Sequence, residues 1–336
     1  MSREAPFPSV RNLTKGQSAI LALKIAFTLV CFWVLFRHID VAELRRTLPG
    51  LVVPWALLAV LLLALQIPLI GLRWLQIAKV LGMRGNQMTI FWMSVAAGIG
   101  QFLGQILPVV AGDGARAWFL VHFGNDWRNA AMSVVIDRCV GIGLLLVFDV
   151  VILLLPSSFG IFGEDRDQIV VVLAVMIAAG VFCLLLGPRV GRALACWRQR
   201  QGRLIEKFFD SARTAVFGPR SAAILGAGCL IHMSTIAAVW LLGQAQGLAL
   251  SLVDAAMLFA VMVGVALVPF TVGGWGLREL AMVSLFGNYG LTPERALIFS
   301  MYFGLANILA SAPGALAWLG FLLAPSQQLS ERDPQT

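Results

Sequence analysis

Long apolar runs alternate with short polar connectors along the whole chain. Six runs hold about eighteen residues or more, enough for a helix to cross a hydrocarbon core of about 30 Å. They predict transmembrane helices at Ala19–Phe36, Val52–Leu72, Asn129–Leu155, Ile169–Leu186, Ala222–Gly243 and Ala296–Leu323. The pattern indicates an all-α polytopic membrane protein.

Two further apolar runs are interrupted in a different way. Ile90–Leu107 is followed at once by Pro108, and Leu252–Val268 by Pro269, with glycines shortly after each proline. Proline and glycine at membrane depth free backbone groups that protein or water must then satisfy. These two runs therefore predict re-entrant helical hairpins rather than simple crossings.

Composition agrees with a membrane protein and excludes several other classes. The chain is 59% hydrophobic and 12% charged, with a mean hydropathy of +0.86. Soluble domains are on average about 45–50% apolar and about 25% charged. A soluble enzyme and a disordered chain are excluded. The five cysteines form no C-x-x-C pair, so we predict no disulfide framework, no metal site and no cofactor.

Charge predicts the orientation in the membrane. The connector 187–221 carries eight Arg and Lys residues, whereas Glu164, Asp165 and Asp167 dominate the connector before it. The positive-inside rule places the basic connector in the cytoplasm, and it explains the net charge of +8 without nucleic acid. Counting crossings places Arg73 on a cytoplasmic loop. It also makes 1–18 and 324–336 cytoplasmic tails of a single domain, 19–323.

The two interruptions predict an internal repeat. Pro108 and Pro269 lie 161 residues apart, close to half of the 336 residues. Each is preceded by two crossings and followed by one, and three crossings separate them, so the halves 19–155 and 169–323 have opposite orientations. Such inverted repeats are common among secondary transporters, which bind substrate between the repeats near the midplane.

An arginine follows each interruption. Where a helix restarts, its free N–H groups and positive dipole end favour anions, phosphate especially. Arg116 and Arg278 lie near these expected restarts, and arginine can bind phosphate through two parallel hydrogen bonds. The alternative is that both arginines extend to the headgroup level. Asp113 is interpreted first as a helix N-cap and second as a substrate contact.

Further charged residues fall inside apolar runs. Adjacent helical residues do not face each other, so Asp137 and Arg138 each need a separate partner, and Arg116 suits Asp137. Arg278 and Glu279 are adjacent as well, and the sequence leaves open which group is the partner of each. A structural charge pair and a proton or headgroup site both remain open for these carboxylates.

These residues form recognisable motifs. The chain resembles the lysylphosphatidylglycerol synthetase transmembrane, or flippase-like, family over about residues 19–323. The resemblance rests on Gln105-Ile106-Leu107-Pro108, Gly112-Asp113-x2-Arg116, Asp137-Arg138 and Pro269-x3-Gly273-Gly274-x-Gly276-x-Arg278-Glu279. Asn is expected at Gln105. The resulting candidate substrate-binding residues are Gln105, Gly112, Asp113, Arg116, Asp137, Arg138, Gly273, Gly274, Arg278 and Glu279.

The resemblance is to a family of bacterial and archaeal membrane proteins, and it implies lipid movement and a bacterial inner membrane. In long members such a region precedes an aminoacyl-transferase domain, for which the residues after 323 leave no room. We therefore expect a flippase that moves an anionic or phosphate-bearing lipid between leaflets, and not an enzyme. The sequence has no G-K-[ST] phosphate loop, so we do not expect ATP hydrolysis. The alternatives are an intramembrane transferase on lipid or polyprenyl phosphates, and a non-transporting subunit of a lipid, for example hopanoid, synthesis system. A lipid-synthesis enzyme is a possible partner.

Overall fold

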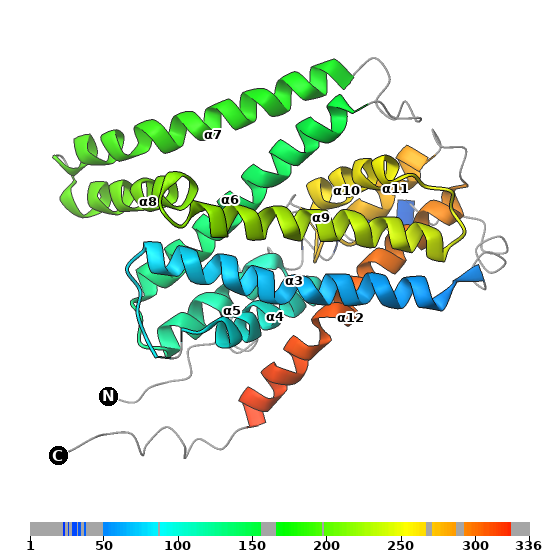
Figure 1. Cartoon of the computed structure of the whole chain (residues 1–336), viewed down its shortest axis with the longest axis horizontal. Helices are drawn as coiled ribbons and strands as arrows, with labels where there is room; N and C mark the ends of the chain where they lie inside the picture. The colour runs from blue at the N-terminus through cyan, green and yellow to red at the C-terminus, as the bar shows by residue number, and fades with distance from the viewer. Residues whose placement is uncertain are drawn as a thin grey trace.

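The computed structural model describes residues 50–86, 88–155, 166–196, 198–266, 271–286 and 292–323, with isolated positions between 23 and 37. Every regular element in the described part of the chain is a helix (Figure 1). The helices are α3 (Val53–Val80), α4 (Ile90–Ile106), α5 (Val109–His122), α6 (Trp127–Leu154), α7 (Arg166–Ala195), α8 (Gln199–Phe217), α9 (Ser221–Ala245), α10 (Leu252–Ala266), α11 (Leu277–Phe286) and α12 (Pro293–Leu323). Most of the predicted crossing at 19–36, both predicted tails and Pro269 lie outside the described residues.

Long helices occupy the other predicted crossings. By length and apolar composition, Val53–Val80, Arg166–Ala195, Ser221–Ala245 and Pro293–Phe321 can each span a membrane. Helix α6 has 28 residues, about 42 Å at 1.5 Å per residue, but it also carries Asp137, Arg138 and Asp149. The protein is therefore a multi-pass helical membrane protein, while the exact number of crossings stays a prediction.

The first interrupted run forms a pair of short helices. Helix α4 ends at Ile106 and α5 begins at Val109, directly after Pro108. Proline suits this place because it has no N–H to satisfy at a helix start. The two helices pack closely: a Cβ on Gly112 would lie 2.1 Å from the Gly100 carbonyl oxygen. Gly112 is therefore a packing residue inside α5, not part of the break.

The second interrupted run also forms two short helices, but its connection differs. Gly273, Gly274 and Gly276 all have positive φ, at 59°, 81° and 86°. Such angles are costly for residues that carry a Cβ. The glycines thus make the turn that starts α11 at Leu277. The new helix therefore follows a proline directly at the first break, whereas three left-handed glycines precede it at the second.

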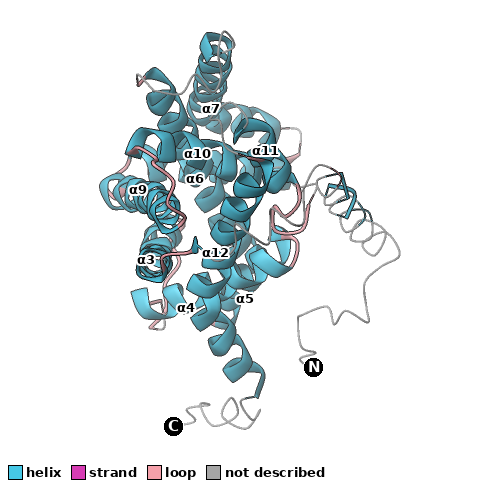
Figure 2. Ribbon diagram, turned by 90° about the vertical axis from the view of Figure 1, so that its right-hand side faces the viewer, coloured by secondary structure: helices cyan, strands magenta, loops and turns pink. Residues whose placement is uncertain are grey.

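Two hydrophobic clusters hold the bundle together. One surrounds α4 and α5 and includes Trp74, Met93 and Phe119; the other surrounds α10 to α12 and includes Phe259 and Phe299. Helices α3 and α9 lie side by side, as both views show (Figures 1 and 2), and each contributes buried residues to both clusters. Each interrupted segment therefore has its own core.

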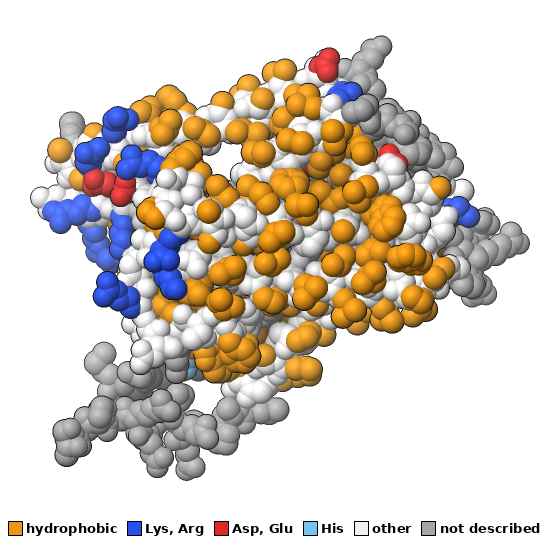
Figure 3. All heavy atoms as spheres, viewed as in Figure 1, with side chains coloured by type: hydrophobic (Ala, Val, Ile, Leu, Met, Phe, Trp, Pro, Cys, Tyr) orange, Lys and Arg blue, Asp and Glu red, His pale blue; other side chains and the backbone are white. Residues whose placement is uncertain are grey.

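The visible surface separates charge from apolar side chains. Lys and Arg side chains gather at the end of the molecule where α8 lies, and hydrophobic side chains cover the middle of this face (Figure 3). The exposed apolar residues include Leu57, Leu61, Val171 and Phe182. A band of this kind fits the lipid-facing surface of a membrane protein.

Candidate functional site

Helices α3, α5 and α6 bring together five charged residues, Arg73, Asp113, Arg116, Asp137 and Arg138, which we name the α5 cluster. Asp137 lies at its centre and is 1% exposed. Its Oδ1 accepts a hydrogen bond from Arg73 Nε, and its Oδ2 accepts one from Arg116 Nη2, both at 2.7 Å. The predicted partnership of Arg116 with Asp137 is confirmed.

Arg138 bonds elsewhere, as its neighbouring position on the helix predicts. Its Nε and Nη2 donate to Asp113 Oδ1 at 3.0 and 2.8 Å. The N-cap interpretation of Asp113 is wrong, because α5 begins four residues earlier and the carboxylate faces Arg138 across the two helices. The Asp113 and Arg138 side chains are 22% and 41% exposed, so this edge of the cluster is its open side.

The cluster has more positive than negative charge. Three arginines face two aspartates, which leaves a formal surplus of one positive charge. The Nε of Arg116 is buried and has no hydrogen-bond partner in the described part of the chain. The Arg116 guanidinium also lies 4.4 Å from the centre of the Trp74 ring. Arg116 is therefore fixed by Asp137 and Trp74, with one donor unused.

Arg73 is a member that sequence reasoning placed wrongly. It was expected on a cytoplasmic loop, but α3 continues to Val80, and Arg73 is buried on that helix. The apolar run itself ends at Leu72, directly before this first charged residue, but the helix does not. A helical continuation was visible, since Gln66 lies seven residues before Arg73, on the same helix face, and is buried as well.

A second buried arginine lies at the start of α11. Arg278 Nη2 and Nε donate to Glu279 Oε1 at 2.6 and 3.0 Å, and we name these residues the α11 pair. The sequence leaves the partners of these two residues open, and the structure shows that each is the partner of the other. Glu279 is the third residue of α11, and its carboxylate turns back to accept the Gly276 N–H at 2.6 Å. This is half of a capping box, and it brings the carboxylate to the arginine.

The α11 pair is enclosed on all the sides that the structure describes. Glu279 is 0% exposed and Arg278 is 3% exposed. The Ser300 hydroxyl donates to Glu279 Oε1 at 3.0 Å and accepts from Arg278 Nε at 3.1 Å. A Cβ on Gly304 would lie 2.4 Å from Arg278 Nη2. Unlike the α5 cluster, the pair has no net charge.

The two interrupted segments touch through the main chain. Trp275 Nε1 donates to the carbonyl oxygen of Gln105 at 3.2 Å. A Cβ on Gly273 would lie 2.5 Å from the same oxygen. Gln105, Gly273 and Trp275 therefore form a junction, whereas Arg116 and Arg278 are held by different carboxylates.

The buried arginines also bear on the alternative that both extend to the headgroup level. In this conformation the side chains of Arg116 and Arg278 are 5% and 3% exposed, and each bonds a carboxylate inside the bundle. Neither guanidinium reaches water as that alternative requires. The arrangement is that of charges kept inside a membrane protein, which are costly and usually functional.

A helical bundle with two interrupted segments and buried arginine–carboxylate groups defines a polytopic membrane protein with charged groups in its interior. The chain belongs to the family described as the lysylphosphatidylglycerol synthase TM region, whose model matches residues 21–314. Comparison with curated proteins returns no match. The family resemblance drawn from the motifs is confirmed, and the family suggests a function connected with membrane lipids.

Proposed function

We propose that this protein moves an anionic or phosphate-bearing lipid between the leaflets of the membrane, with the headgroup phosphate at the α5 cluster. The observation that carries the proposal is the surplus positive charge of that cluster. A single charged residue at the centre of a membrane helix costs about 2.5–3.5 kcal/mol on insertion scales. A bound anion offsets that cost.

The size of the surplus favours a lipid with one negative charge. A phosphodiester headgroup carries one such charge and neutralises the cluster, while Arg116 still bonds Asp137. The unused Nε donor of Arg116 and the partly exposed Arg138 are suited to phosphate oxygens, because hydrogen bonds between ions are about twice as strong as neutral ones. We place Arg278 outside the headgroup site, since Glu279 already neutralises it.

The open edge of the cluster suggests a route for the headgroup. Exposure rises from Asp137, at 1%, to the Asp113 and Arg138 side chains, at 22% and 41%. A headgroup entering at this edge meets Arg138 first and Arg116 last, while its acyl chains stay in lipid. The lipid is moved without chemical change, and the protein acts as a transporter, not as an enzyme.

The helix order supports an inverted repeat as the basis of transport. Helices α3 to α6 have 28, 17, 14 and 28 residues, and α9 to α12 have 25, 15, 10 and 31. Each series is a long helix, two short ones and a long one, and the two short pairs are labelled in opposite halves of Figure 1. We propose that each short pair is re-entrant from its own side, with the basic end in the cytoplasm of a bacterial cell.

The test is transfer of fluorescent phosphatidylglycerol across vesicles that contain only this protein. Arg116→Lys keeps the charge but loses the planar fork, and we expect transfer to fall about tenfold, the value of a charged hydrogen bond. Arg213→Lys is the matched control, because Arg213 is exposed and bonds Asp210 at 2.9 Å.

Wild-type transfer by Arg116→Lys would refute the headgroup site. Mass spectrometry of the recovered lipid separates transport from transferase activity, since only a transferase alters its mass. Activity that requires an added lipid-synthesis enzyme would instead support the role of a subunit.

A further inference from the structure

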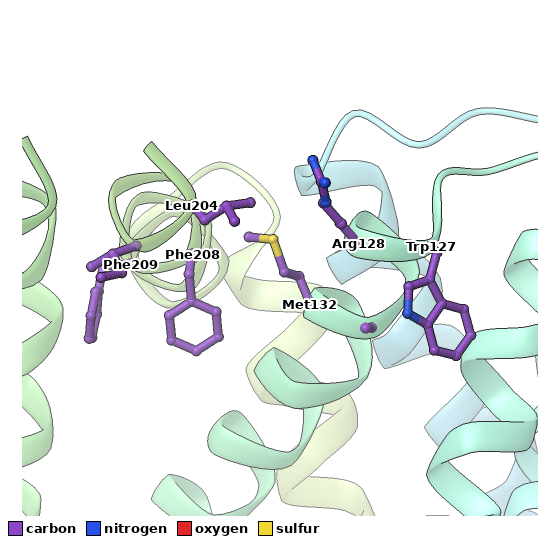
Figure 4. Close-up of a pocket in the computed structure, with 8 residues that line it drawn as sticks. Trp127, Arg128, Met132, Leu204, Phe208 and Phe209 are labelled. Carbon is purple, nitrogen blue, oxygen red and sulfur yellow. The ribbon is translucent and has the colours of Figure 1, made fainter. Parts of the chain in front are cut away.

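An apolar groove lies at the basic end of the molecule, away from the α5 cluster. It has a volume of about 420 Å³ and lies between the start of α6 and the middle of α8. The apolar lining includes Trp127 and Met132 from α6 with Leu204, Ile205, Phe208 and Phe209 from α8. In Figure 4 the Leu204 and Met132 side chains point toward each other, and the Arg128 guanidinium points away from the apolar side chains.

Helix α8 has the character of an interfacial helix. Its apolar residues recur at positions 204, 205, 208, 209 and 212, while Arg200, Arg203, Lys207 and Arg213 are all exposed. A helix with one apolar and one basic face lies in the plane of the membrane surface. Trp127, which is 54% exposed beside the groove, belongs to a residue type that favours the same level.

The rim of the groove carries basic residues that no carboxylate neutralises. The two acidic residues of α8 are already engaged, Glu206 with Arg192 at 3.6 Å and Asp210 with Arg213 at 2.9 Å. Arg128 and Arg200 have no carboxylate partner within the described ranges. Arg200 lies one turn before Leu204, on the groove face of α8. The rim therefore offers positive charge above an apolar floor.

We propose that this groove binds one anionic phospholipid, with an acyl chain between α6 and α8 and the phosphate at Arg128. The unneutralised basic rim favours an anionic over a zwitterionic headgroup. The long apolar floor favours an acyl chain over a soluble anion. The site is separate from the transported lipid and does not depend on the proposed function, because it shares no residue with the α5 cluster.

Trp127 provides a local probe of occupancy. The full chain is placed in phosphatidylcholine nanodiscs with rising amounts of phosphatidylglycerol that is brominated on its acyl chains. The fluorescence of Trp127 is obtained as the tryptophan fluorescence of the wild type minus that of Trp127→Phe, and its quenching by bromine is measured. Brominated phosphatidylcholine serves as the headgroup control. We expect phosphatidylglycerol to quench at roughly tenfold lower mole fraction, because the basic rim attracts its net negative charge, whereas the choline cation of phosphatidylcholine offsets the charge of the phosphate.

Two variants test the parts of the site, and each is compared with its own Trp127→Phe form. Arg128→Gln should remove the headgroup preference, whereas Arg213→Gln, the same charge change on α8 outside the groove, should keep it within about twofold, as expected for an exposed ion pair. Ala131→Leu fills the groove without changing charge and should abolish quenching. Arg116→Lys, which keeps the buried charge and is expected to slow lipid transfer, should leave quenching unchanged, so that loss of transport is distinguished from loss of binding in the groove.

Equal quenching by the two brominated lipids would overturn the proposal, as would equal effects of Arg128→Gln and Arg213→Gln. Absence of quenching by either lipid would also overturn it and would leave the groove to a protein partner.

Discussion

The α5 cluster and the α11 pair both join arginines to carboxylates, but they differ in charge balance. Each lies next to an interruption, and each places an arginine beside a tryptophan, Trp74 at 4.4 Å and Trp275 at 4.8 Å. In the α11 pair one arginine meets one glutamate, and the Ser300 hydroxyl bonds both. In the α5 cluster three arginines share two aspartates, and one buried donor has no partner among the described residues.

This difference separates two uses of buried charge. A neutral, enclosed pair fixes the start of α11 and leaves nothing for a ligand to neutralise. A cluster with surplus charge and an exposed edge is costly without a ligand and suited to an anion. Similar motifs in the two halves of the chain therefore indicate related folds but not equal roles.

The largest effect is expected when Asp137 loses its charge. Asp137→Asn leaves Arg73 and Arg116 buried without a carboxylate between them, and breaking a buried ion pair costs about 3–5 kcal/mol. We expect poor expression and a large fall in the thermal unfolding midpoint of the purified protein. Asp210→Asn, which breaks an exposed pair, should cost less than about 1 kcal/mol. Equal midpoints for the two variants would contradict the central role of Asp137.

The next largest effect is expected in double variants, which show whether removal of both partners of an ion pair restores thermal stability. Arg278→Met with Glu279→Gln removes a balanced pair, so the double variant should recover most of the stability that either single change loses. Arg116→Met with Asp137→Asn should recover much less, because Arg73 stays buried and unpaired. Thermal unfolding of the six variants measures both interactions. Full recovery in the α5 cluster would mean that Arg73 does not depend on Asp137.

The smallest effect is expected when a glycine near each of the two breaks is replaced by alanine. Gly273→Ala forces a Cβ into a positive-φ position beside the Gln105 carbonyl, which we expect to cost about 1–3 kcal/mol. Gly114 follows the other break but lies inside α5, and a Cβ there meets nothing within 4 Å. Gly114→Ala should therefore stabilise the protein by about 0.5–1 kcal/mol. If both substitutions lower the unfolding midpoint equally, the helical assignment of Gly114 is wrong.

Hydropathy predicts most of the described fold, because each long helix has to present an apolar surface to lipid. It places α3, α7 and α9 to within a few residues at their first ends. It also places the last end of α9, but it fails at the last ends of α3 and α7. The predicted ends are Leu72 and Leu186, and the helices continue to Val80 and Ala195. A helical bundle tolerates charged residues where helices pack against each other. Hydropathy along the chain does not show which helix faces will be packed in this way.

The site could be predicted in part. Helix geometry correctly separates the partners of Asp137 and Arg138, because both residues lie in mid-helix. The same rule fails for Arg278 and Glu279, which lie in the first turn, where the glutamate turns back to the Gly276 N–H. The role of Asp113 was missed because the break was placed at the glycines. Proline alone ends α4, so Asp113 lies a full turn inside α5.

The junction of Trp275 with Gln105 has an evolutionary consequence. The acceptor is a main-chain carbonyl, which every amino acid supplies, so position 105 can change by mutation without removing the contact. The donor is an indole side chain, and the adjoining Gly273 admits no Cβ. Substitution is therefore tolerated at position 105 but not at positions 273 and 275. A related chain with asparagine in place of Gln105 keeps the same acceptor, and the pressure to preserve the junction falls on residues 273 and 275.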